Sequence, residues 1–276
     1  MILVPRDSSD PVVRFVDTNE STFISHYCNG FEQTDGTVVI DAIAMDSFPL
    51  APPAEEGQEV LKHVDFERDV PFATLVRYKL APKGSSNFEV TKETLSKRLI
   101  EFPVVNPSFA GRVYRFIYAV GGRDLHVSCP PQILVKIDTF TGQETTWSPE
   151  PHQFLGEPCF VSRITTSTAS IHQQQHNDNN SNNNNNNNNN RAEDLTEDSG
   201  YILTYLNDGK ALTTEILIFN AQEIASGPIS RCLLPVYVPP GLHGSFAPGL
   251  VFDPELVQQK FASSKEIDSR NWGEAL

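Results

Sequence analysis

Two histidines lie in surroundings that favour metal binding. His26 stands within the segment Phe23–Glu32, where an apolar stretch meets a turn, and His243 follows Pro239-Pro240-Gly241 and precedes Gly244. The prolines make that turn rigid and the glycines allow close approach of the backbone, so the His243 side chain is aimed reproducibly. Because neutral imidazole is a common metal ligand, the two positions indicate one shared metal site. The alternative for each is a strand-end histidine held by a single hydrogen bond.

Two glutamates have apolar neighbours that make their burial expected. Glu101 lies within Leu99–Pro103, and Glu157 lies within Phe154–Phe160. A buried carboxylate needs a hydrogen-bond donor, and the outward N–H of a metal-bound imidazole is one such donor. Backbone N–H groups or an arginine are the alternative donors. Glu101 and Glu157 are therefore candidates for orienting the two histidines.

The composition excludes several classes of protein. The 276 residues carry a net charge of -14, which argues against nucleic acid and anionic membrane surfaces as partners. The four cysteines (Cys28, Cys129, Cys159 and Cys232) form no CxxC pair, so we expect neither a structural zinc site nor a disulfide framework. No apolar run approaches the roughly 20 residues of a transmembrane helix. The start, Met1–Asp7, has no signal-peptide pattern and resembles the middle of a strand.

The elements that must position these side chains are short strands. Apolar and β-branched runs separated by turn residues predict strands at 12–16, 37–44, 74–80, 95–102, 114–119, 132–138, 201–206, 215–219 and 229–234. Asp35-Gly36 predicts a hairpin turn, and only Asp253–Phe261 carries a good helix signal. The pattern is typical of an all-β barrel, sandwich or propeller, and a propeller best explains how distant strand ends reach one axis.

A polar tract interrupts this pattern at about 164–196. It contains Gln173–Gln175 and an unbroken asparagine run at 182–190, without apolar periodicity. Such a segment cannot bury enough apolar surface to offset its ordering entropy. We expect a disordered insertion inside a strand hairpin from 160–161 to 201–202, and we expect its His172 and His176 to bind nothing.

Five motifs in order carry a resemblance to a known family. They are Leu3–Arg6, Phe23–Glu32, Ile100–Pro107, Gly156–Val161 followed by Glu197–Tyr201, and Pro240–Gly244. Together they resemble the carotenoid cleavage oxygenases, which include carotenoid, apocarotenoid and lignostilbene dioxygenases. The resemblance implies a seven-bladed β-propeller with capping loops, and one Fe(II) held by four histidines that three glutamates orient. By motif, His26 and His243 take the places of two iron ligands, and Glu101 and Glu157 those of two orienting carboxylates.

The resemblance also implies an activity. Such an enzyme is a non-haem Fe(II)-dependent dioxygenase that uses O2 to cleave a double bond of a carotenoid, apocarotenoid or related polyene or stilbene to two carbonyl products. The implied partners are an apolar polyene and O2, with peripheral membrane contact as a family tendency. The compartment, cytoplasm or plastid, is not indicated by the sequence.

The chain departs from the family in length, because the family's first two iron ligands lie in an N-terminal half that is absent here. His63, His126 and His152 lack the flanking pattern of those ligands. We therefore expect residues 1–276 to be the C-terminal part of a propeller domain, which needs the missing half or a partner chain to complete its iron site. Three interpretations stay open: a fragment of an active dioxygenase, a truncated non-catalytic product with a binding or structural role, and one half of a split enzyme.

Overall fold

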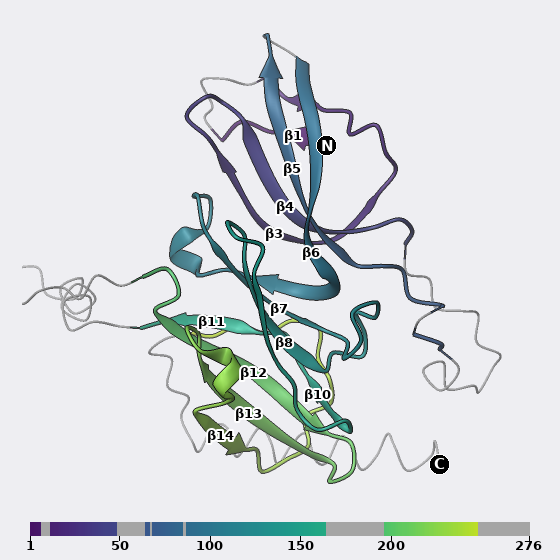
Figure 1. Ribbon diagram of the computed structural model, residues 1–276, viewed down its shortest axis with the longest axis vertical. Helices are drawn as coiled ribbons and strands as arrows, with labels where there is room; N and C mark the ends of the chain where they lie inside the picture. The colour runs from purple at the N-terminus through teal and green to yellow at the C-terminus, as the bar shows by residue number, and fades with distance from the viewer. Residues whose placement is uncertain (7–11, 49–63, 67, 85–86, 164–195, 248–276) are drawn as a thin grey trace, which may run out of the picture. The chain divides into compact units, whose positions relative to one another are not determined.

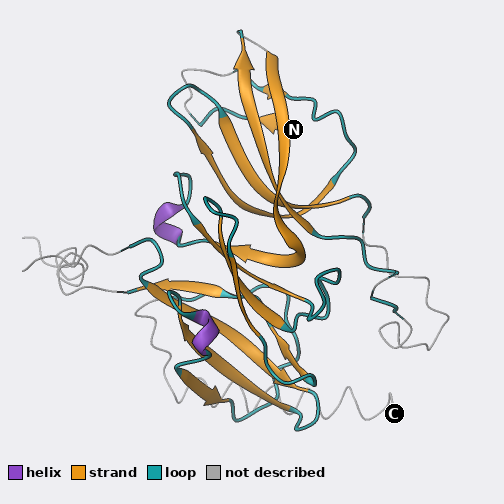
Figure 2. Cartoon of the chain, in the orientation of Figure 1, coloured by secondary structure: helices purple, strands orange, loops and turns teal. Residues whose placement is uncertain are grey.

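The computed structural model describes residues 1–6, 12–48, 64–66, 68–84, 87–163 and 196–247 (Figures 1 and 2). The chain divides into two compact units, Met1–Gly244 and Ser245–Leu276, and every element below lies in the first. The predicted all-β class is confirmed, because the helices among the described residues are two short 3-10 turns, η2 (Pro107–Phe109) and η3 (Ile224–Ser226). The predicted helix at 253–261 lies outside the described residues, as do His63, His172 and His176.

The largest sheet consists of two four-stranded meanders that share one strand. Its seven antiparallel strands are β3 (Phe23–Glu32), β4 (Val38–Met45), β5 (Thr74–Lys83), β6 (Asn87–Val104), β7 (Phe116–Gly121), β8 (Ile133–Asp138) and β9 (Glu144–Trp147), in that order. The long β6 pairs with β5 over residues 87–99 and with β7 over residues 100–104. A four-stranded antiparallel sheet is the usual blade of a β-propeller.

A second sheet forms a third meander. Its strands are β10 (Gln153–Leu155), β11 (Cys159–Ser162), β12 (Gly200–Asp208), β13 (Thr213–Asn220) and β14 (Ser230–Leu233), with β10 and β11 pairing with successive parts of β12. The predicted hairpin around the polar tract is confirmed, since Phe160 pairs with Ile202 and Val161 with Tyr201. A separate two-stranded sheet joins β1 (Ile2–Leu3) to β2 (Arg14–Phe15).

Most predicted strands differ from the observed ones by a few residues at their ends, and two cases show why. The strand predicted at 12–16 is reduced to β2, and the strand predicted at 95–102 begins earlier, because β6 starts at Asn87. The early part of β6 is rich in charged, exposed residues and therefore has a weak apolar signal. It is held by its pairing with β5 and by surface ion pairs such as Lys83 with Glu89, at 3.1 Å. Backbone pairing thus extends the strand beyond its apolar residues.

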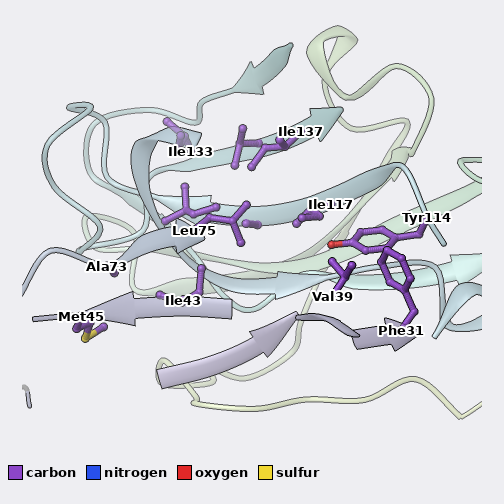
Figure 3. Close-up of a cluster of buried hydrophobic side chains, with 13 residues drawn as sticks. Phe31, Val39, Ile43, Met45, Ala73, Leu75, Tyr114, Ile117, Ile133 and Ile137 are labelled. Atoms are coloured by element: carbon purple, nitrogen blue, oxygen red, sulfur yellow. The ribbon is translucent and has the colours of Figure 1, made fainter. Parts of the chain in front are cut away.

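Two hydrophobic cores bind the meanders together. The first draws on β4, β5, β7 and β8 (Figure 3), and the second on β7, β8, β12 and β13. Along β7, Ile117 and Ala119 belong to the first core, whereas Tyr118 and Val120 belong to the second. Because successive residues of a strand point to opposite faces, β7 and β8 are buried on both faces. This explains their largely apolar sequences and is the packing expected of successive propeller blades.

A buried polar network ties β3, β4 and β5 to the segment before β7. Asp41 is fully buried and accepts hydrogen bonds from the Arg77 guanidinium at 2.8 and 2.7 Å, and from the Tyr114 hydroxyl. The Cys28 Sγ lies 3.8 Å from the same hydroxyl. Burial, helped by the Asp41 charge, raises the pKa of both Tyr114 and Cys28, so both remain protonated at neutral pH. The network fixes β3 two residues beyond His26.

The two ends of the polar tract are held side by side. The β11–β12 ladder reaches the pair Ser162 and Gly200, and the Arg163 N–H then donates to the Ser199 carbonyl at 3.1 Å. We expect that replacing residues 164–195 with a four-residue Gly-Ser linker leaves the fold intact. The free energy of unfolding should rise by about 2 kcal/mol at most, because each halving of a flexible loop lowers its closure cost by about 0.6 kcal/mol.

Urea unfolding of both forms, followed by tryptophan fluorescence, measures this difference in free energy. A linker variant less stable than the parent chain by about 1 kcal/mol or more, well outside the expected loop effect, would mean that the tract packs against the fold. The description of the tract as an insertion would then be wrong.

Candidate metal centre

His26 on β3 is hydrogen bonded to Glu101 on β6. Its Nδ1 lies 2.6 Å from Glu101 Oε2, and the two side chains are 22% and 9% exposed. An ionised carboxylate can only accept, so Nδ1 donates and Nε2 keeps its lone pair. Glu101 receives two further hydrogen bonds: the Ser25 hydroxyl donates to Oε1 at 2.8 Å, and the Phe102 N–H donates to Oε2 at 3.2 Å. The carboxylate is therefore held from three sides.

Backbone irregularities bring these groups together. The pairing of β3 with β4 shifts register between Ile24 and His26, so Ser25 and His26 both reach Glu101, although neighbours on a regular strand point to opposite faces. The pairing of β6 with β7 shifts register between Glu101 and Val104. Within that shift Phe102 has φ 54°, in the left-handed region that a bulky residue rarely adopts. Both strands are distorted where they meet at the candidate centre.

His243 is paired with Glu157 in a similar way. Its Nδ1 lies 3.2 Å from Glu157 Oε1, and the Gly244 N–H donates to Oε2 at 2.8 Å. Glu157 lies in the turn between β10 and β11. The His243 side chain is 55% exposed, so this pair is more open to solvent than the pair of His26 and Glu101. Each of the two histidines is thus hydrogen bonded to one of the two glutamates, and their role at a metal ion stays a prediction.

The two imidazoles lie next to each other although they come from opposite ends of the chain. Their ring centroids are 5.3 Å apart, with an angle of 82° between the rings. The Phe102 ring contacts both, at 5.0 Å from His26 and 5.9 Å from His243. Each imidazole has Nδ1 bonded to a carboxylate and Nε2 left for another ligand. This arrangement is typical of histidines that bind a metal ion.

The donor chemistry fits Fe(II) as part of a coordination shell. Neutral imidazole nitrogen suits iron among other transition metals. Among the described residues, no group of three or more His, Cys, Asp or Glu side chains gathers where it could hold a metal ion. At this place the described part of the chain therefore supplies a metal ion with two imidazole ligands, His26 and His243. Burial, with the nearby Glu101 charge, raises the pKa of the Cys129 thiol, which is therefore protonated at neutral pH.

Within the described residues, the other histidines lie away from this pair, and further motif residues make other contacts. His126 is exposed in the loop after β7, and the His152 Nε2 lies 3.4 Å from Asp208. Asn29 binds the loop after η2: its side-chain nitrogen donates to the carbonyls of Phe109 and Arg112, and its oxygen accepts from the Gly30 and Gly111 N–H groups. The Glu197 carboxylate accepts from the backbone N–H groups of residues 115 and 116. These motif residues hold loops in place.

Sequence reasoning missed Ser25 and Phe102. Ser25 is next to His26 in the chain, but strict alternation would place it on the other face of the strand. Phe102 lies inside the motif Ile100–Pro107, yet nothing in its spacing indicates a left-handed backbone. Both residues reach the centre because the strand pairing shifts register beside them, and the sequence pattern did not predict those shifts.

The stacked antiparallel meanders place the chain in the β-propeller class. It belongs to the RPE65/carotenoid cleavage oxygenase family, because the family model described as retinal pigment epithelial membrane protein matches residues 1–248. The resemblance inferred from the sequence motifs is thereby confirmed.

Relatives and solved structures agree with this assignment. The chain is 28% identical over 247 residues to the apocarotenoid-15,15'-oxygenase of Synechocystis sp., covering 90% of this chain and 42% of that protein. It is 22% identical to the lignostilbene-alpha,beta-dioxygenase isozyme III of Sphingomonas paucimobilis, covering 85% and 43%. It matches the crystal structure of cobalt-substituted Synechocystis ACO with a TM-score of 0.69 at 27% identity, covering 89% and 43%. The chain thus spans about two fifths of the length of these relatives.

None of the helices within the described residues is both long and apolar enough to cross a membrane.

Proposed function

We propose that the chain is the C-terminal part of a non-haem Fe(II)-dependent dioxygenase. In this proposal the enzyme cleaves a double bond of a carotenoid, apocarotenoid or related polyene or stilbene and releases two carbonyl products. The observation that carries the proposal is the pair of imidazoles with ring centroids 5.3 Å apart, each bonded through Nδ1 to a carboxylate. The names of the curated relatives, which are oxygenases and dioxygenases, support the reaction class.

The residues of this chain would have distinct tasks. His26 and His243 would hold the iron through Nε2, while Glu101 and Glu157 keep the proton of each imidazole on Nδ1 and fix the ring orientation. Fe(II), when bound, supplies the activation of O2 beside the double bond. Phe102 presents an apolar ring against both imidazoles, which suits an apolar polyene as the substrate.

The rest of the coordination shell would come from outside the described residues. Two imidazoles alone form a weak and unselective site, and the matched relatives are more than twice as long as the matched region. We therefore propose that an N-terminal half, in the same chain or as a separate partner, supplies the remaining ligands. The net charge of -14 argues against nucleic acid as a further partner, and peripheral membrane contact rests on family tendency alone.

The alternative is a truncated, non-catalytic propeller fragment with a binding or structural role. What favours it is that the described residues gather two imidazoles and no third metal-ligating side chain beside them. In this case the surface of the fold would bind a partner or serve as a structural element. The His–Glu pairs would then be hydrogen bonds that stabilise the fold and bind no metal ion.

One experiment separates these proposals. The purified chain is titrated anaerobically with Fe(II), then exposed to O2 and to carotenoid, apocarotenoid and stilbene substrates, with aldehyde products detected by mass spectrometry. We expect iron binding by the chain, and product only when an N-terminal half is supplied in the same chain or as a separate polypeptide. A folded chain that binds no iron and gives no product even when an N-terminal half is supplied would support the non-catalytic alternative.

A further inference from the structure

The Ser25 hydroxyl and the His26 imidazole both contact the Glu101 carboxylate. The hydroxyl donates to Glu101 Oε1 at 2.8 Å, while His26 Nδ1 lies 2.6 Å from Oε2 of the same carboxylate. The register shift between Ile24 and His26 turns the serine toward Glu101. Ser25 and His26 are thus hydrogen bonded to different oxygens of the Glu101 carboxylate.

Glu101 depends on these donors because it is buried. Its side chain is 9% exposed, and an ionised carboxylate in such a place needs a donor on each oxygen. Oε2 has two donors, His26 Nδ1 and the Phe102 N–H, whereas Oε1 accepts from the Ser25 hydroxyl. Without that hydroxyl, the carboxylate would gain by rotating toward another donor, and the rotation disturbs the bond to His26.

The second histidine pair has an equivalent arrangement built from main chain. Glu157 offers Oε1 to His243 Nδ1 and receives the Gly244 N–H on Oε2. In both pairs, therefore, one carboxylate oxygen meets the imidazole and the other is anchored by a second donor. At Glu157 this second donor is a backbone N–H, and at Glu101 it is the Ser25 side chain, which a mutation can remove.

We propose that Ser25 is a positioning residue of the candidate metal centre. By anchoring Oε1 it directs Oε2 to His26 Nδ1–H, keeps the imidazole in one tautomer and leaves Nε2 free for the metal ion. The effect on metal affinity rests on the proposed function, whereas the effect on the tautomer rests on the hydrogen bonds alone.

The test compares Ser25→Thr with Ser25→Val in the full chain. The two replacements have nearly the same shape and both suit a strand, but only threonine has a hydroxyl. Ser47→Ala is the matched control, because Ser47 also donates to a carboxylate, that of Asp46 at 3.3 Å, but at an exposed position. Nitrogen-15 NMR at fixed pH reports the His26 tautomer in the metal-free chain, and anaerobic titration with Co(II) reports metal affinity.

We expect a single Nδ1–H tautomer in the wild type, in Ser25→Thr and in Ser47→Ala, and a mixture in Ser25→Val. The Co(II) affinity of Ser25→Val should fall on the order of tenfold, as expected for losing a hydrogen bond to a charged group. Glu101→Gln, which removes the carboxylate itself, should lose about 10- to 100-fold.

The outcomes distinguish the inference from the proposed function. If Ser25→Val keeps the wild-type tautomer and affinity, or if Ser25→Thr behaves like Ser25→Val, the proposal for Ser25 is wrong. If the wild-type chain binds no Co(II), even with an N-terminal half supplied, while Ser25→Val still mixes the tautomers, the positioning role stands and the metal-binding function fails.

Discussion

Replacing His26 with alanine should weaken Fe(II) binding by the chain, and replacing His243 should do the same. The two rings lie side by side with centroids 5.3 Å apart, and each has its Nδ1 occupied by a carboxylate. Removing either one leaves a single imidazole, which binds Fe(II) more weakly than the pair does. Anaerobic equilibrium dialysis with iron analysis measures the loss.

The chain provides its own control for that experiment. His152 contacts Asp208 and has no place in the pair, so His152→Ala should bind Fe(II) as the wild type does. Circular dichroism of each variant establishes that the fold is retained. If His26→Ala and His243→Ala both keep wild-type iron binding, the metal lies elsewhere and the assignment of the centre is wrong.

The largest expected effect on stability comes from Arg77→Ala. The change leaves the Asp41 carboxylate, which is fully buried, with the Tyr114 hydroxyl but without its bidentate cation. Breaking a buried ion pair by removing one partner typically costs about 3–5 kcal/mol. Because natural domains are stable by only about 5–15 kcal/mol, the variant should lie close to its folding limit. Urea unfolding at neutral pH measures the free-energy change.

A neighbouring ion pair on the same strand supplies the comparison. Lys79 pairs with Glu93 at 3.0 Å, but both side chains are more than two fifths exposed. Lys79→Ala should therefore change the free energy of unfolding by less than about 1 kcal/mol. In addition, Asp41→Ala combined with Arg77→Ala should cost less than the sum of the single changes, because the two residues interact directly. Equal costs for Arg77→Ala and Lys79→Ala would mean that burial of the pair is energetically unimportant.

Local pattern predicted most of the strands because most of them bury at least part of their side chains, although the predicted strand β14 is exposed along its whole length. β7 and β8 are buried on both faces, and their apolar runs identified them. The hairpin across the polar tract was also predictable, since Phe160 and Ile202 are apolar residues flanking a segment that cannot form a core. β10 was missed, because three residues are too few to show a period.

The candidate centre was harder to predict from the local sequence pattern than the strands were. His26 and Glu101 are 75 residues apart, so spacing alone does not indicate that they meet, and the family resemblance supplied that link. The resemblance did not supply Ser25 or Phe102, because their positions depend on a register shift and on a left-handed residue. Irregular backbone is a property of how strands pair, and the residue types along one strand do not encode it directly.

The left-handed backbone of Phe102 lowers the stability of the fold at a residue whose ring contacts both imidazoles. Holding a non-glycine residue in that region costs on the order of 1–3 kcal/mol, a strain that glycine would not incur. Glycine would, however, remove the ring that contacts both imidazoles. Because the ring also packs partly against the second hydrophobic core, glycine would exchange backbone strain for lost packing, and the strain is what holds this ring at the centre.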